Sequence, residues 1–277
     1  MRLAKLKDGL KRTVYLASMR KKALRPFKPI VSTRPAFIFG AQRSGTGMLT
    51  DTLQLHPETE VYDERPDGEI YDRYRIRDFK TVRKVLDRSR ASLTCFKAIC
   101  DSHIVHEFVD AFPNARLLWI TRHYADVANS RLRKFERATR PIKIVCNGGE
   151  GGGWFQEGAS AETAGILRDV YSDQLTEFDL SCLAWWARNR IFVEKELYKF
   201  PNLMSLRYED VVTEPAAATR RVCEFLQLPY VEATHRHLFQ TSIQKHDCPD
   251  LDPEVKRLCD SLLDEIQSHG QPSGVAV

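Results

Sequence analysis

The stretch Pro35-Ala-Phe-Ile-Phe-Gly-Ala-Gln-Arg-Ser-Gly-Thr-Gly-Met-Leu49 decides the fold. It opens with a short apolar run that ends at Gly40, and the segment from Met48 to Leu55 reads as a helix stopped by His56-Pro57. The order strand, glycine-rich turn, helix is typical of a parallel α/β sheet. The backbone N–H groups of such a turn, together with the helix N-terminus, point at one place and bind an anion. The stretch therefore predicts a buried strand, a phosphate-binding turn and a helix.

Strands and helices alternate along the rest of the chain. Connecting helices of this kind predict right-handed crossovers and a mainly parallel sheet that is covered on both faces. We therefore predict one α/β domain over residues 35–269, with a P-loop-NTPase-like, mainly parallel sheet flanked by helices, and a flexible tail over 270–277. Further strands are expected at 92–99, 116–121 and 203–208, and helices at about 102–112, 124–137, 180–199 and 215–227.

The bulk composition excludes several classes of protein. No apolar run reaches the roughly 18 residues that a membrane span needs, and no secretory signal is recognisable. The seven cysteines are odd in number and scattered, without CxxC or Cys/His spacing. We therefore expect reduced thiols, a cytoplasmic protein and no metal site.

The first 34 residues form a basic leader. They carry eleven Lys or Arg residues and one acid, Asp8, and apolar residues recur at helical spacing from Leu3 to Ala17. Two interpretations stay open, namely a solvated helix packed on the domain and peripheral contact with an anionic membrane. Nothing in the leader indicates recognition of nucleic acid.

Residues 139–179 interrupt the alternation. Five glycines between Gly148 and Gly153 precede Trp154-Phe155. Such an insertion is either a mobile loop on the substrate side of a site or a disordered connection.

The turn after Gly40 differs from the P-loop of ATP-binding enzymes. In the pattern G-x-x-x-x-G-K-[ST], Thr46 stands where the lysine belongs, and Gly47 replaces the hydroxyl that holds Mg²⁺. A cation is present instead inside the turn, as Arg43. A P-loop nucleotide kinase stays an alternative that predicts Mg·ATP binding, but the turn favours a ligand bound without metal.

The segment Phe37-Ile-Phe-Gly-Ala-Gln-Arg-Ser-Gly-Thr46 resembles the 5′-phosphosulfate loop of sulfotransferases that use 3′-phosphoadenosine 5′-phosphosulfate (PAPS). The common form of that loop is G-x-x-R-S-G-T-T. The match runs through Thr46 and departs at Gly47, where the family has a second threonine that contacts phosphate. The resemblance implies donor contacts from Gln42, Arg43, Ser44, Gly45, Thr46 and Gly47.

A second stretch, from Ala115 to Ser130, resembles the 3′-phosphate element of the same family. In that element a strand ends in an arginine and a serine follows eight residues later, here Arg122 and Ser130. Because Ser130 lies about two helical turns beyond Arg122, both side chains can hold one phosphate from two sides. The 3′-phosphate distinguishes PAPS, and its product 3′,5′-ADP (PAP), from ATP.

Weaker resemblance continues toward the C-terminus. The segment Leu206-Arg-Tyr-Glu-Asp-Val211 and the later Cys223-Glu-Phe-Leu-Gln-Leu-Pro229 are similar to the end of many sulfotransferase cores, where we expect structural roles. Beyond them, Ser242 and Lys245 lie where the family often returns to the nucleotide, so the resemblance implies phosphate contacts there.

Sulfuryl transfer, by analogy with phosphoryl transfer, needs a base and cations on the leaving phosphate. Arg43 is placed for the leaving group. Lys97 resembles the strand lysine of the family, which stabilises the same charge, although a lysine at a strand end can also simply reach solvent.

The base has two candidates. The histidine that steroid and phenol sulfotransferases carry two residues after the strand lysine is Ile99 here. Glu64, which lies 21 residues beyond Arg43, matches the glutamate of tyrosylprotein sulfotransferases. We expect cationic neighbours to lower the pKa of Glu64 and keep it ionised, the alternative being one more solvated acid. His103 is the fallback base, because an ordinary histidine pKa suits that role.

Together these features predict a PAPS-dependent sulfotransferase that acts on a hydroxyl or amine of a small-molecule or glycan acceptor. A non-catalytic nucleotide-binding protein of the same fold stays an alternative. Aromatic candidates for the acceptor pocket are Tyr71, Trp154, Phe155, Trp185 and Trp186, of which the last two also suit a helix core.

Overall fold

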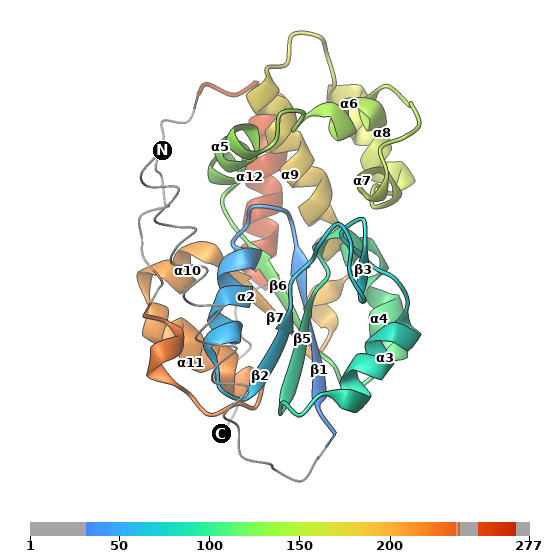
Figure 1. Cartoon of the computed structure of the whole chain (residues 1–277). Coiled ribbons are helices and arrows are strands. Elements are labelled where there is room, and N and C mark those ends of the chain that lie inside the picture. The colour runs from blue at the N-terminus through green and yellow to red at the C-terminus, as the bar shows by residue number, and fades with distance from the viewer. Residues whose placement is uncertain (1–31, 237, 239–248, 270–277) are drawn as a thin grey trace.

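The protein is built on a five-stranded parallel sheet, seen in a computed structural model that describes residues 32–236, 238 and 249–269 (Figure 1). The strand order is β2-β5-β1-β6-β7, and each neighbouring pair is parallel. The predicted α/β fold with a mainly parallel sheet is confirmed. The strands are β1 (Arg34–Gly40), β2 (Thr59–Tyr62), β5 (Leu93–Lys97), β6 (Arg116–Thr121) and β7 (Leu203–Arg207).

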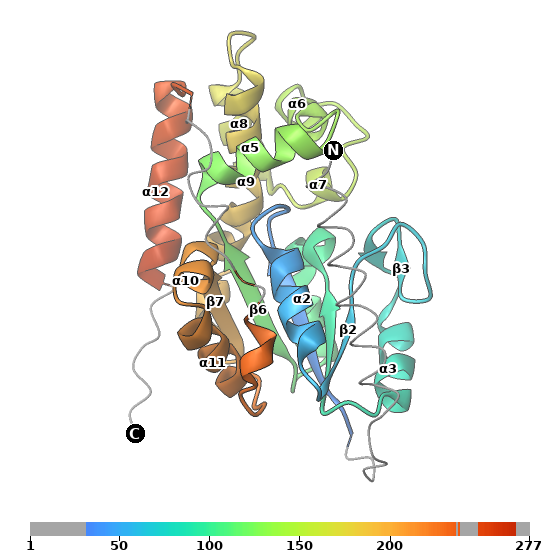
Figure 2. The same ribbon diagram turned by 60° about the vertical axis from the view of Figure 1, so that its left-hand side comes forward.

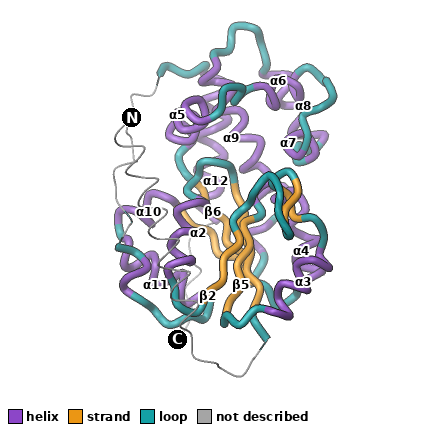
Figure 3. Tube along the Cα trace, in the orientation of Figure 1, coloured by secondary structure: helices purple, strands orange, loops and turns teal. Residues whose placement is uncertain are grey.

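Two apolar layers cover the sheet because alternate residues of each strand face opposite sides. Phe37 and Phe39 pack into one layer, whereas Ala36 and Ile38 pack into the other. The first layer also contains side chains of α3 (Phe79–Arg88), α4 (Val105–Ala111) and α9 (Glu177–Glu194), and the second those of α2 (Thr46–Leu55) and α11 (Pro215–Phe225). Figure 3 shows the strands enclosed between these helices.

Further helices extend beyond the carboxyl ends of the strands (Figures 1 and 2). The longest is α9, which begins at a capping box made by Thr176 and Asp179 and packs against α12. Since the turns that follow β1, β5 and β6 lie at this same edge, the helices enclose the place where the predicted site residues meet. The helices at this edge are α5 (Tyr124–Lys134), α6 (Arg140–Cys146), α7 (Trp154–Glu157), α8 (Ala161–Val170), α9 and α12 (Pro253–His269).

The expectation for residues 139–179 was wrong, because this region contains α6, α7 and α8. The glycines from Gly148 to Gly153 form the turn between α6 and α7. Gly148, Gly151 and Gly153 have φ values of 65°, 93° and 57°, and no atom lies within 4 Å of a Cβ added at any of them. Positive φ is the conformation that glycine adopts without steric cost. The glycine cluster therefore marks helix connections rather than one long loop.

Several short elements were not predicted. The edge strand β2 has four residues in an acidic stretch, and the hairpin of β3 (Tyr71–Asp72) and β4 (Arg75–Ile76) turns at Arg73-Tyr74, with φ values of 47° and 68°. Such turns usually contain Asn or Gly, so the sequence lacks the usual signal. Among other differences, β7 ends at Arg207 where α10 (Tyr208–Thr213) begins, and the helix predicted at 102–112 starts as the 3₁₀-helix η1 (Ile99–Ile104).

Six cysteines lie in the described residues, and each is buried with a free thiol. In the same part of the chain no helix has the length and apolarity to cross a membrane, and no His, Cys, Asp and Glu cluster has the arrangement of a metal site.

Candidate active site

The turn between β1 and α2 depends on two glycines. A Cβ on Gly40, whose φ is 129°, would lie 2.6 Å from the Ile120 carbonyl oxygen, and one on Gly45, whose φ is 99°, would lie 2.4 Å from Cδ2 of Tyr208. Ser44, between them, is fully buried, and its Oγ has no hydrogen-bond partner. A buried hydroxyl without a partner costs free energy, and an anion bound in the turn would satisfy it. The turn therefore fits a phosphate-bearing ligand.

The two predicted phosphate elements meet in the structure. Nε of Arg43, in the turn after β1, donates a hydrogen bond of 2.9 Å to Oγ of Ser130 on α5. The pKa of Arg43 is lowered by burial first, and then by the nearby charges of Arg122 and Arg133. Cations that lie close enough to lower one another's pKa repel each other, and a bound polyanion would relieve that repulsion.

Arg122 follows β6 and is held from two sides. Its guanidinium carbon lies 4.3 Å from the ring centroid of Tyr208, and its Nη2 lies 3.1 Å from Oδ2 of Asp126. Tyr208 therefore contacts Arg122 with its face and lies against Gly45 of the turn, so it touches both phosphate elements. The sequence predicted only a structural role for the segment that contains Tyr208. Its position after β7, the neighbour of β6, is the signal that could have placed it here.

Lys97 ends β5 and lies between two carboxylates. Its Nζ is 3.0 Å from Oδ1 of Asp63 and 3.4 Å from Oε1 of Glu64. The side chains of Lys97 and Glu64 are 11% and 12% exposed, so the pair is largely withdrawn from water. The structure thus brings the predicted base and the predicted strand lysine together.

Burial, and not the cationic neighbour, dominates the pKa of Glu64. Loss of hydration raises this pKa to about 7, while the charge of Lys97 opposes the rise. The expectation that cations would lower it was wrong, because the desolvation of a carboxylate exceeds the attraction of one ammonium that Asp63 shares. A pKa near neutrality suits general base catalysis.

His103 is a poor base in this environment. Burial, followed by the charges of Arg188 and Arg75, lowers the pKa of His103 to about 4. The expectation of an ordinary histidine pKa was therefore wrong. At neutral pH the imidazole is uncharged and weakly basic, so Glu64 is the better candidate.

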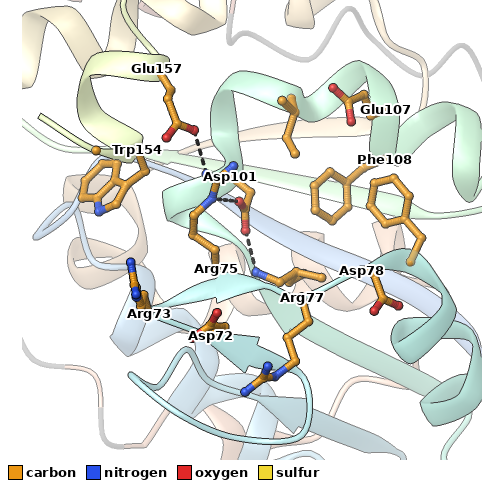
Figure 4. A pocket seen from close by; sticks show the side chains of 14 residues that line it. Asp72, Arg73, Arg75, Arg77, Asp78, Asp101, Glu107, Phe108, Trp154 and Glu157 are labelled. Atoms are coloured by element: carbon orange, nitrogen blue, oxygen red, sulfur yellow. Dashed lines mark hydrogen bonds and ion pairs between the residues drawn. The ribbon is translucent and has the colours of Figure 1, made fainter. Parts of the chain in front are cut away.

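A cavity of about 670 Å³ lies between the β3–β4 hairpin, η1 with α4, and α7 (Figure 4). Arg75 is one of the lining residues and forms two ion pairs there. Its Nε lies 2.8 Å from Oδ1 of Asp101, and its Nη1 lies 2.7 Å from Oε2 of Glu157. Asp101 lines the cavity, and its charge is the smallest of the influences that raise the pKa of Glu64. The apolar lining comes from Ile76, Phe79, Ile104, Phe108 and Trp154.

Among the aromatic candidates for the acceptor pocket, Trp154 lines this cavity. Trp185, Trp186, Phe155 and Tyr71 are instead buried in the core. Trp185 also donates from Nε1 to the carbonyl oxygen of Arg122 and so supports the end of β6.

Some predicted residues lie outside the described part of the chain. These are Ser242 and Lys245, most of the basic leader, and the tail from residue 270 onward.

A sequence profile described as the sulfotransferase domain matches residues 33–256. The chain belongs to the sulfotransferase family. Enzymes of this family are PAPS-dependent transferases, so the alternative of a P-loop nucleotide kinase was wrong.

Solved sulfotransferase structures align with most of the chain. The enzyme from Alicyclobacillus acidocaldarius is 17% identical with a TM-score of 0.48, and the alignment covers 87% of this chain and 95% of that one. The sulfotransferase domain from the curacin biosynthetic pathway is 15% identical with a TM-score of 0.47, at coverages of 88% and 94%. A mouse sulfotransferase complexed with PAP is 12% identical with a TM-score of 0.46, at coverages of 84% and 85%. No curated protein sequence gives a significant match.

The departure of the sulfotransferase motif at Gly47 gives a first testable prediction. No atom lies within 4 Å of a Cβ added to Gly47, so Gly47→Thr fits without displacing its neighbours. We expect the added hydroxyl to tighten PAP binding about 3- to 10-fold, because a hydrogen bond to a charged phosphate contributes about 1.5–3 kcal/mol before the side chain is ordered. Isothermal titration calorimetry measures the change. Gly165→Thr on α8, a second helical glycine with open space around it, is the control and should leave PAP affinity unchanged.

Proposed function

We propose that this sulfotransferase moves a sulfuryl group from PAPS to a hydroxyl or amine of a small-molecule acceptor. The observation that carries the proposal is the Arg43–Ser130 hydrogen bond, because it joins two sequence elements that are 87 residues apart into one cationic site. A ligand with phosphates at both ends of a nucleoside suits such a site, whereas a ligand with a single phosphate group would engage one half of it.

For the donor, we assign the 5′ end to the turn of Gln42, Arg43, Ser44, Gly45, Thr46 and Gly47, and the 3′-phosphate to Arg122 and Ser130. The buried Ser44 hydroxyl and the crowded guanidinium groups support this assignment. When bound, PAPS supplies an activated sulfuryl group on a good leaving phosphate.

The chain supplies the base and the cations. Glu64 accepts the acceptor proton as the new bond from acceptor oxygen or nitrogen to sulfur forms, while the bond from sulfur to the bridging oxygen breaks and PAP leaves. Lys97 and Arg43 stabilise the charge that develops on the leaving phosphate. A base with a pKa of about 7 is partly ionised at neutral pH and still basic enough to take the proton.

For the acceptor, we assign the cavity beside Asp101. Its volume of about 670 Å³ lies in the range of small-molecule sites, and its lining combines apolar side chains with charged ones. The lining includes five carboxylates and three guanidinium groups, and Arg75 is already paired with two of those carboxylates. This balance disfavours a polyanionic glycan and favours a compact acceptor with an apolar part.

Calorimetry with PAP, with and without Mg²⁺, followed by transfer assays from PAPS, tests the proposal. We expect micromolar PAP binding that does not need Mg²⁺, and turnover with at least one member of an acceptor panel of aryl alcohols, aliphatic alcohols and amines. A protein that ignores PAP would refute the donor assignment. PAP binding without turnover on any acceptor would favour the non-catalytic alternative.

A further inference from the structure

A buried arginine next to Ser130 has no role in the site described so far. Arg131 on α5 is 5% exposed, and burial alone, with no charge of a described carboxylate, shifts its pKa. Its Nη1 donates to Oε1 of Gln42 at 3.2 Å, and its Nη2 donates to the carbonyl oxygen of Ala138 at 3.0 Å. Burial lowers the pKa of Arg131 to about 10, which still leaves it charged at neutral pH.

The contact with Gln42 determines how that amide is oriented. A guanidinium carries donors and no acceptor, so only the oxygen of the Gln42 amide can face Arg131. The NH₂ group of Gln42 must then point the other way. Gln42 belongs to the phosphate turn and is partly exposed, so its NH₂ group is the part of the side chain free to donate to a bound anion.

We propose that Arg131 is a positioning residue that fixes the Gln42 amide with its NH₂ group toward the anionic end of the donor. This inference rests on the proposed function. Without Arg131, the amide can rotate and present its oxygen to a phosphate or sulfuryl group, which repels it. The buried charge of Arg131 also favours the anion directly, because no charge of a described carboxylate acts on it.

A double-mutant cycle with PAP affinity as the readout tests this role. We expect Arg131→Met and Gln42→Met each to weaken PAP binding about 10-fold, and Gln42→Met to have little further effect when Arg131→Met is already present. Lys134→Met is the matched control, since it removes one positive charge from an exposed position of the same helix. It should change the affinity by less than about 3-fold, because an exposed charge is screened.

Two outcomes would overturn the inference while the wild-type protein still binds PAP. One is an Arg131→Met loss equal to that of Lys134→Met, and the other is a pair of losses that multiply in the double variant. If the wild type itself does not bind PAP, the proposed function fails and the inference fails with it.

Lysine at position 131 separates positioning from packing. Arg131→Lys keeps a charged donor for the Gln42 oxygen, so we expect PAP affinity within about 3-fold of the wild type and an unchanged kcat. If Arg131 only filled space, Arg131→Met would keep PAP affinity and Arg131→Lys would lose it. If Arg131→Met does not fold, Gln42→Glu serves instead, because it places a carboxylate oxygen where the NH₂ group was. It should weaken PAP binding at least about 10-fold, and an unchanged affinity would again refute the inference.

Discussion

The variant Glu64→Gln is expected to lose about 10²- to 10⁴-fold in kcat while binding PAP within about threefold of the wild type. Glutamine has nearly the same shape as glutamate but cannot accept the acceptor proton, and general base catalysis contributes an effect of this size. Steady-state transfer from PAPS and calorimetry with PAP measure the two quantities. Glu69→Gln, an exposed carboxylate of the same acidic stretch, is the control and should retain full activity. Unchanged turnover in Glu64→Gln would exclude it as the base.

The raised pKa of Glu64 adds a pH signature to this prediction. Because the base must be ionised, kcat of the wild type should rise with pH up to about 7 and then level off. Glu64→Gln should abolish that dependence. A wild-type profile that is flat between pH 5.5 and 8 would contradict the assignment.

The same group affects stability, with a definite sign. The pKa of Glu64 rises from 4.5 in the unfolded chain to about 7 in the fold, so the folded state holds the proton more tightly. The protonated Glu64 therefore stabilises the folded state below pH 4.5, and this contribution to the free energy of unfolding is lost as pH rises through 7. Glu64→Gln should therefore unfold with a free energy about 2 to 3 kcal/mol higher than the wild type at pH 8, and with little difference at pH 5. Denaturant unfolding at the two pH values measures this.

The variant Arg122→Ala is expected to weaken PAP binding about 30- to 100-fold and binding of 5′-AMP by less than about 3-fold. The two nucleotides differ only in the 3′-phosphate, and a charge-assisted hydrogen bond to a phosphate is among the strongest that proteins make. Calorimetry with both nucleotides gives the ratio, which a general loss of folding would not alter.

Lys134→Ala, an exposed cation at the end of α5, is the control for the loss of one positive charge. It should lower both affinities slightly and by the same factor. If Arg122→Ala also weakens both nucleotides equally, the 3′-phosphate is bound elsewhere.

Much of the fold followed from local patterns. The apolar run before Gly40 and the run over 116–121 each predicted a strand, and the structure pairs these strands as β1 and β6. Residues 139–179 were misjudged because glycine content outweighed weaker helix signals, such as the cap that Ser160 provides to Thr163.

The electrostatics of the site could not be predicted from local sequence patterns. Spacing identified Glu64, but its pKa depends on how completely folding removes it from water, which neighbours distant in the chain decide. Arg131 illustrates the same point. In the basic helix that also carries Arg133 and Lys134, the pattern does not reveal which cation is buried beneath the phosphate turn.

The central position of β1 has a consequence for dissecting the protein. In its register Ala36 lies opposite Cys95 on one side and Arg116 on the other, so both partners come from distant parts of the chain. An excised peptide that carries the whole 40–49 motif would lack both flanking strands and every side chain that crosses from α5. The proposed donor binding therefore requires the assembled sheet, and a deletion variant that keeps the motif but lacks either flanking strand is expected to lose it.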